Sequence, residues 1–445
     1  MTAPLRLAPR EGETVEGFGR ALRSGATTCA AALEHCFHQI DLWDEKVHAW
    51  VFIDRAGAMK RARALDEDLR GGRDHGPLHG VPIGVKDIVD VAGMPTAAGF
   101  GPWKDKVSDR DAALVTNLRD AGAVILGKTI TTQFAWIDPP PTLNPWELTR
   151  TPGGSSSGSA VAVATGMCLA SIGTQTGGSI IRPASFCGVY GYKPPFGAVS
   201  VEGVLPFAPS LDHSGVMARS VEGLRLVGQV ISGTPIGARA DDPPVLYRLR
   251  GSFEFLAHSA ADRAMSEALT RFVEADAWLD DRGPSFDGVI DAHRVIMARE
   301  AAGVHAERFA AHPSAYRPMI RSLIEEGSAC TDDDEWKARD LGRRFGEEIT
   351  GRVFGTASVR GRGEAIVTPA ATGQAPDTAT TGDPVFNSPW SLTGAPVISI
   401  PVSLSPDGLP LAIQLVGRRD EVEELFAVAL WCERTLRAAG REPEA

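Results

Sequence analysis

Short apolar segments typical of buried strands alternate with helical segments along much of this chain. The strand-like segments are 49–53, 81–85, 123–126, 167–172, 365–367, 397–400 and 411–416. Helical spacing or composition marks 112–121, 160–166 and 421–436. Interleaved strands and helices predict an α/β fold, in which a mixed β-sheet core is covered by helices on both faces and carries a helical cap.

The 445 residues are interpreted as a single domain with four parts. Residues 1–70 form a helical N-terminal scaffold, and residues 71–234 form the core that carries the glycine-rich motifs. Residues 235–344 are charged and helical in pattern, and we expect them to form the cap. Residues 345–445 return the chain to the sheet and end in a C-terminal helix.

Composition and charge exclude several classes of partner. A net charge of −11 and a pI near 5.5 disfavour a nucleic-acid or anionic-membrane partner, since both reward concentrated Lys and Arg. No apolar run approaches the ~20 residues of a membrane span, and the N-terminus lacks the apolar core of a secretory signal, so we expect a cytoplasmic protein. Free, mostly buried thiols are expected at the six scattered cysteines, Cys29, Cys36, Cys168, Cys187, Cys330 and Cys432.

Two glycine- and serine-rich loops and one lysine form the strongest chemical pattern. Ser155 lies in Thr-Pro-Gly-Gly-Ser-Ser-Ser-Gly-Ser, Ser179 follows a Gly-Gly pair, and Lys86 ends the strand-like segment 81–85. Each element alone is an ordinary turn or a surface lysine. Together they predict a Ser-Ser-Lys site, because a serine nucleophile needs a base and a lysine kept neutral by burial can supply it. The predicted activity is that of a hydrolase.

Two other motifs match known patterns in the wrong context. Residues 122–129 fit GxxxxGK[ST], which would make Lys128 and Thr129 part of a nucleotide site, but Ala-Val-Ile-Leu favours a strand over a phosphate loop. Residues 154–158 fit GxSxG with Ser156 as nucleophile, but the preceding segment is polar and contains a proline. Ser156 is therefore interpreted as a supporting residue.

Histidines offer no stronger alternative. His35 and His38 lie at i, i+3 on a helix and lack the further ligands that a metal site needs. His213 has no local nucleophile to serve and is interpreted as structural. We therefore expect neither a metal nor a cofactor.

Lys86, Ser155 and Ser179, together with their flanks, closely resemble the amidase signature family over nearly the whole chain. Further matching segments are 76–82, 121–129, 210–220 and 409–418. The resemblance implies that Ser179 is the acyl-accepting nucleophile, that Ser155 bridges to it after a cis peptide bond, and that Lys86 is the general base. It also implies an oxyanion hole and a set of supporting residues. The oxyanion hole comprises the backbone N–H groups of Thr176, Gly177, Gly178 and Ser179, and the supporting residues are Ser156, Thr174, Gln175 and Arg182.

Three positions depart from the common family pattern, which has aspartate at Gln175, glycine at Ser157 and an arginine one residue before Arg182. This version resembles amidases of small amides and urea-type compounds related to allophanate hydrolase. The substrate is accordingly expected to be a small amide or urea-type molecule. Three residues of the expected cap are candidate anion-binding groups: Tyr316, Arg317 and Arg321.

Alternatives to a free-standing amidase stay open at this point. One is the A-type subunit of a glutamine-dependent amidotransferase, which needs a partner protein. The nucleotide-binding protein is the other. Candidate surfaces for a homodimer are the helical N-terminal region and the cap.

Overall fold

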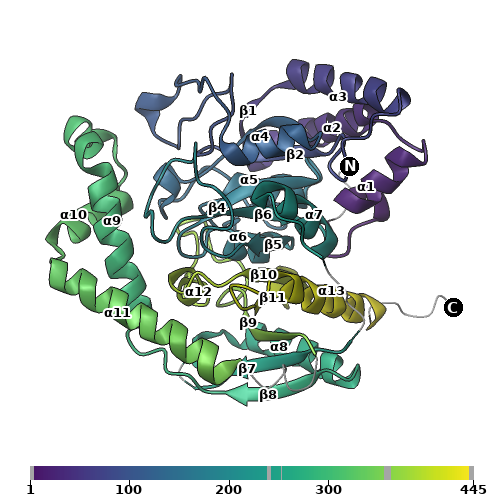
Figure 1. The fold of residues 1–445 in the computed structure, drawn as a ribbon. Coiled ribbons are helices and arrows are strands. Elements are labelled where there is room, and N and C mark those ends of the chain that lie inside the picture. Colours follow the sequence, from purple (N-terminus) through teal and green to yellow (C-terminus); the bar gives the residue numbers. More distant parts are fainter. Residues whose placement is uncertain (1–4, 238–241, 252, 355–361, 440–445) are drawn as a thin grey trace.

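The computed structural model describes residues 5–237, 242–251, 253–354 and 362–439, and within these residues eleven strands form one mixed sheet (Figure 1). Their order across the sheet is β1-β3-β2-β4-β6-β5-β10-β11-β9-β7-β8. The strands are β1 Trp50–Ile53, β2 Pro82–Lys86, β3 Val124–Thr129, β4 Ala170–Gln175, β5 Tyr190–Lys193, β6 His213–Ala218, β7 Val245–Leu249, β8 Trp278–Arg282, β9 Glu364–Pro369, β10 Val397–Leu404 and β11 Pro410–Val416.

Helices cover both faces of this sheet, as the alternation of strands and helices predicts. On β5, Tyr192 packs against Phe426, with ring centroids 4.8 Å apart. The neighbouring Gly191 faces the other way, where an added Cβ would lie 2.9 Å from the Ala184 side chain. The α-helices are α1 Val15–Arg23, α2 Cys29–Val47, α3 Arg55–Arg70, α4 Ala113–Asp120, α5 Ser157–Ala164, α6 Ile181–Cys187, α7 Val221–Ser232, α8 Ser259–Glu274, α9 Val289–Ala311, α10 Pro318–Ala329, α11 Asp332–Glu348, α12 Ser388–Leu392 and α13 Val422–Ala439.

The register of the central strands places the chemical motifs at one edge. β2 runs parallel to both β3 and β4, with Val85 opposite Ile172. Carboxyl ends of parallel strands lie on the same side of a sheet. Lys86, the last residue of β2, therefore lies near the loop that follows β4.

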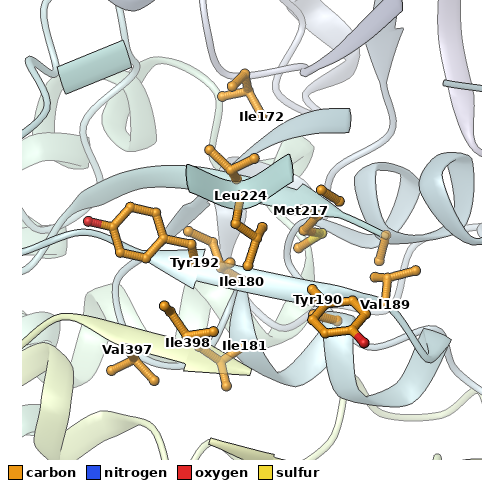
Figure 2. Close-up of a cluster of buried hydrophobic side chains, with 14 of the residues drawn as sticks. Ile172, Ile180, Ile181, Val189, Tyr190, Tyr192, Met217, Leu224, Val397 and Ile398 are labelled. Carbon is orange, nitrogen blue, oxygen red and sulfur yellow. The ribbon is translucent and has the colours of Figure 1, made fainter. Parts of the chain in front are cut away.

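Buried side chains join the two halves of the sheet where β5 pairs with β10. Figure 2 shows Ile172, Tyr192, Met217 and Ile398 among the side chains gathered there. These residues come from β4, β5, β6 and β10, so N-terminal and C-terminal segments share one core.

Residues 235–344 contain more than the expected helices, because β7 and β8 also lie within them. β7 is an apolar strand between β8 and β9. β8 lies at the edge of the sheet, has the sequence Trp-Leu-Asp-Asp-Arg and is partly exposed, and charge on an exposed edge strand is common. Because of these charged residues, the segment is not recognisable as a strand from its sequence. Helices α9, α10 and α11 form an arm beside the sheet (Figure 1).

Across the part of the chain that the structure describes, no helix is both long and apolar enough to cross a membrane. All six cysteines are free, and five of them are buried. Cys330 is partly exposed. The expectation of free, mostly buried thiols is confirmed.

Candidate active site

Lys86, the last residue of β2, is completely buried. Its Nζ lies 2.7 Å from Ser155 Oγ and 2.7 Å from Thr174 Oγ1. Burial lowers the pKa of Lys86 well below its usual value, and the Asp212 carboxylate opposes this shift. Burial therefore favours the neutral amine, which can accept a proton from a serine hydroxyl.

Ser155 is held in a tight turn entered through a cis Gly154–Ser155 peptide bond, which the family resemblance implies. The Gly154 carbonyl accepts a hydrogen bond from Arg182 Nη2 at 2.8 Å. Ser157 Oγ donates to the Gly153 carbonyl at 2.7 Å. Both bonds hold the backbone just before Ser155, and the second closes the turn from Ser157.

Ser156 ties the same turn to β4. Its Oγ accepts a hydrogen bond from the Thr174 N–H and donates one to the Thr174 carbonyl, each at 3.2 Å. The side chain is fully buried and is used within the protein. This arrangement agrees with its interpretation as a supporting residue.

Exposure separates the three residues of the predicted triad. Lys86 is 0% exposed, Ser155 is 1% exposed and Ser179 is 9% exposed. Ser179 lines a cavity of about 190 Å³ that neither of the other two residues lines. The lysine is thus innermost, and the nucleophile predicted from the sequence borders the space that a substrate could enter.

The loop over residues 176–179 connects β4 to α6 and lines the same cavity. Gln175 Oε1 accepts hydrogen bonds from the N–H groups of Ile180 and Ile181, at 2.9 and 3.1 Å. No described residue accepts a hydrogen bond from the N–H groups of Gly177 and Gly178. These two groups are available to bind a negatively charged oxygen.

Asp212 is a site residue that sequence reasoning missed. Its carboxylate accepts a hydrogen bond from Thr176 Oγ1 at 2.6 Å, and burial raises its pKa to about 6. The available signal is its place in the family-like segment 210–220, next to His213. Burial lowers the pKa of His213 well below its usual value, and its Nδ1 lies 2.7 Å from the Leu211 carbonyl oxygen.

His293 and Ser391 were also missed. His293, on α9, is 3% exposed, and its Nε2 lies 2.9 Å from the Thr176 carbonyl oxygen. Ser391, on α12, donates a hydrogen bond to the Gly177 carbonyl at 2.7 Å. One of the two histidines of α9 and a serine outside any motif give no chemical signal in the sequence.

The remaining walls of the cavity combine apolar and charged groups. Trp136 and Phe207 stack with ring centroids 5.6 Å apart, and Met297 of α9 lines the same cavity. Arg182 and Asp383 also contribute to the lining. Burial lowers the pKa of Arg182 to about 10, while the Asp383 carboxylate opposes that shift.

The three proposed anion-binding residues do not line this cavity. Tyr316 is buried in an aromatic cluster, 5.1 Å from the Phe134 ring centroid. Arg317 Nη1 donates to the Pro139 carbonyl, and Arg321 Nη2 donates to the Pro313 carbonyl. The structure therefore does not bring these three residues to the cavity, because the arm uses their side chains for its own packing and for contact with the loop before the candidate site.

The nucleotide-site motif is a buried strand. Residues 124–129 form β3, and Lys128 Nζ lies 3.3 Å from Asp87 Oδ1. The same amine donates hydrogen bonds to the Pro95 carbonyl and to Thr96 Oγ1. His35 and His38 are exposed on α2, as expected for a solvated helix face.

The chain is similar to known proteins in both sequence and structure. Residues 31–263 match the family described as Amidase. The A-type subunit of glutamyl-tRNA(Gln) amidotransferase from Streptomyces avermitilis is 32% identical, with 91% of each chain covered. AmiD from Mycobacterium tuberculosis, a putative amidase by name, is also 32% identical, over 89% of this chain and 88% of AmiD. The crystal structure of an amidase superposes with a TM-score of 0.86 at 31% identity, covering 95% of this chain and 99% of that one.

Proposed function

The chain belongs to the amidase family of hydrolases that act on carbon–nitrogen bonds, and from this premise we propose that it cleaves an amide or urea-type bond through an acyl-enzyme on Ser179. The observation that carries the proposal is the buried Lys86 amine, 2.7 Å from Ser155 Oγ. Its lowered pKa favours the form that acts as a base.

Acylation begins with two proton transfers. Lys86 takes the proton of Ser155, and Ser155 takes the proton of Ser179, whose Oγ then attacks the substrate carbonyl carbon. The carbonyl oxygen becomes negatively charged and is stabilised by the backbone N–H groups of the loop over residues 176–179. Lys86 then returns its proton through Ser155 to the leaving nitrogen, and the carbon–nitrogen bond breaks.

Deacylation repeats these steps with water in place of Ser179. Water attacks the ester carbon while the relay accepts its proton. The bond between Ser179 Oγ and the acyl carbon then breaks, and Ser179 recovers its proton. The products are a carboxylic acid, or a carbamic acid from a urea-type substrate, and ammonia or an amine.

The cavity supports a small substrate. Its volume of about 190 Å³ is below the ~300 Å³ at which ordinary ligand pockets begin. The Trp136 and Phe207 rings supply apolar contact, while Asp383 and Arg182 add charge. A short acyl group or a urea derivative fits this combination, in line with the subgroup suggested by the Gln175 version of the motif.

A second candidate function is the A-type subunit of a glutamine-dependent amidotransferase. The similarity to the Streptomyces avermitilis protein favours it. In that case glutamine is the substrate and a partner protein receives the ammonia. A cytoplasmic location and homodimer formation remain predictions under either function.

Amine release from a substrate panel tests the proposal. The panel contains aliphatic amides, aryl amides, glutamine and urea derivatives such as allophanate, and the wild type is compared with Ser179→Ala. We expect release that falls by ~10³-fold or more in Ser179→Ala, because the nucleophile is lost. Ser24→Ala, which changes an exposed serine at the end of α1, is the control and should match the wild type.

Activity that survives in Ser179→Ala refutes the assignment of the nucleophile. Release from glutamine alone, and only when a partner protein is added, favours the amidotransferase function. Release from several small amides by the isolated chain favours the free-standing amidase.

A further inference from the structure

The loop over residues 176–179 is held from two sides by side chains that lie far away in the sequence. The Nε2 atom of His293, on α9, lies 2.9 Å from the Thr176 carbonyl oxygen. Ser391 of α12 donates to the next carbonyl, that of Gly177, at 2.7 Å. Two consecutive peptide groups are therefore fixed through their oxygens.

Fixing a carbonyl also fixes the N–H group of the same peptide. A trans peptide is planar, and its C=O and N–H bonds point in opposite directions. Within the described residues the cis bond is at Gly154–Ser155, so the peptides of this loop are trans. The Thr176 carbonyl shares its peptide with the Gly177 N–H, and the Gly177 carbonyl shares its peptide with the Gly178 N–H.

We propose that His293 and Ser391 are positioning residues that aim the Gly177 and Gly178 N–H groups at the substrate carbonyl oxygen. The proposal rests on the amidase function given above. Neither side chain has to touch the reacting atoms. Each acts through the peptide that it holds, and His293 makes the arm helix α9 a part of this alignment.

The protonation state of His293 suits this role. Burial lowers its pKa to about 4, although its bond to the Thr176 carbonyl acts the other way. The ring is therefore neutral near pH 7, and it carries its hydrogen on Nε2 because a carbonyl oxygen can only accept. The ring also packs against the loop, since a Cβ at Gly177 would lie 3.5 Å from His293 Cε1.

Gln175 supports the second of these contacts, the hydrogen bond from Ser391 to the Gly177 carbonyl. Its Nε2 donates to Ser391 Oγ at 3.2 Å, while its Oε1 accepts the N–H groups of Ile180 and Ile181. An aspartate at this position could accept those N–H groups and has no donor for Ser391. The glutamine of this chain thus links the start of α6 to the serine that holds Gly177.

The test compares His293→Leu, which removes the donor, with His293→Gln, which keeps a neutral N–H donor of similar reach. Hydrogen–deuterium exchange of the peptide covering residues 175–181 reports on the loop itself. The rate at which a fluorophosphonate labels Ser179 reports on the alignment, because its phosphoryl oxygen occupies the place of the carbonyl oxygen. In labelling, the Ser179 Oγ–P bond forms, the P–F bond breaks, and fluoride leaves with the serine proton.

We expect His293→Leu to exchange faster over residues 175–181 and to label ~10- to 100-fold more slowly, somewhat less than the loss on removing an oxyanion donor itself. His293→Gln should recover most of both. His305→Leu is the matched control, because His305 is a buried histidine of the same helix that does not line the cavity. It should lower thermal stability and leave loop exchange and labelling within ~2-fold of wild type, as expected for a site outside the alignment.

Wild-type exchange and labelling in a folded His293→Leu protein would overturn the proposal. So would a His293→Gln protein as impaired as His293→Leu. If the wild type neither labels nor releases amine from any substrate, the hydrolytic function fails. The positioning of the loop by His293 is then tested by the exchange data alone. Equal exchange in His293→Leu and wild type refutes it.

Discussion

Two buried lysines near the active site differ in what surrounds them. Burial lowers the pKa of Lys128, and the Asp87 carboxylate, 3.3 Å from the amine, opposes this shift by favouring the charged form. The amine of Lys86 instead contacts the hydroxyls of Ser155 and Thr174. A lysine without a carboxylate in contact gives up its proton more readily when buried. This difference explains why Lys86 suits proton transfer and Lys128 suits packing.

Asp212 is expected to influence how kcat/KM falls at low pH, because it acts on the pKa of Lys86. Its carboxylate raises the pKa of Lys86, against the larger effect of burial. Asp212→Asn removes that charge, so the Lys86 pKa should fall further and the enzyme should keep its base to lower pH. We expect the acid limb of kcat/KM to move to lower pH.

A pH series of kcat/KM for wild type and Asp212→Asn measures this change. Asp333→Asn removes the same charge from an exposed position on α11 and is the control, with no expected movement. An acid limb that stays in place or moves to higher pH in Asp212→Asn contradicts the role given to Asp212.

The limits of prediction are clear at single residues. Lys86, Ser155 and Ser179 are predictable because glycine-rich loops and a strand end have local patterns. His293 is not, because its function depends on a carbonyl more than one hundred positions away in the sequence. Tyr316 does not line the cavity, because its ring packs in an aromatic cluster, and a polar residue in a charged segment gives no sequence signal for that packing.

At the scale of elements, the arm depends on its attachment to the loop before the active site. Asp138 is buried and accepts hydrogen bonds from the N–H groups of Met319 and Ile320, at the start of α10, at 3.0 and 2.9 Å. Gln133 accepts the Arg317 N–H at 2.7 Å. Since the neighbouring Trp136 and the arm helix α9 both contribute to the cavity wall, this attachment helps to position that wall.

Removing this attachment should weaken both stability and substrate binding. Asp138→Ala leaves two N–H groups at the start of a helix without their acceptor, a change expected to destabilise the protein by ~1–2 kcal/mol. KM should rise more than kcat falls, because the catalytic relay is untouched. Thermal unfolding and steady-state kinetics check both effects.

Asp138 uses both carboxylate oxygens, Oδ1 for the Met319 N–H and Oδ2 for the Ile320 N–H. Asp138→Asn keeps one of these two acceptors, so its loss in both measurements should lie between those of wild type and Asp138→Ala. Equal loss in the Asn and Ala variants would show that hydrogen bonding to α10 is not the reason for the effect. An unchanged KM in a destabilised Asp138→Ala protein would show that the attachment of the arm does not affect substrate binding.

The sequence predicts the central strands of the sheet better than its edge strand β8. Strands β2, β3, β10 and β11 have apolar sequences between turns, and they lie close to where the sequence places them. β8 was missed because partial exposure at an edge permits the acidic pair Asp280 and Asp281. Helical periodicity identified the region of the arm, but its attachment through Asp138 has no sequence signal.

At the scale of the whole molecule, buried neutral histidines make stability depend on pH. Burial lowers the pKa of His293 to about 4 and that of His305 to about 3, against a usual value of 6.5. At pH values between the usual pKa of 6.5 and these lowered values, the histidines of the unfolded chain bind protons and those of the folded protein do not. Folding stability therefore falls as the pH falls through this range. Asp212 acts in the opposite sense, because its pKa is raised to about 6 and the folded protein binds its proton first.

We therefore expect a lower free energy of unfolding at pH 4.5 than at pH 7. The two histidines together outweigh Asp212, since a pKa difference of one between the folded and unfolded states corresponds to about 1.4 kcal/mol. Urea unfolding at the two pH values measures the difference. His305→Gln should reduce it, since the glutamine cannot titrate, and equal stability of the wild type at both pH values contradicts the expectation.

Pairing of β5 with β10 has a consequence for how the molecule is made. A ribosome completes β1 to β6 and the segment bearing Ser179 long before it reaches residues 397–404, so β5 remains an open edge for much of synthesis. Ser391 is also made late, as is His293 by comparison with the nucleophile. Under the proposed function, the growing chain therefore contains the proposed nucleophile before it contains the residues proposed to align the oxyanion groups. Activity is then expected only after the C-terminal strands have paired with the N-terminal half of the sheet.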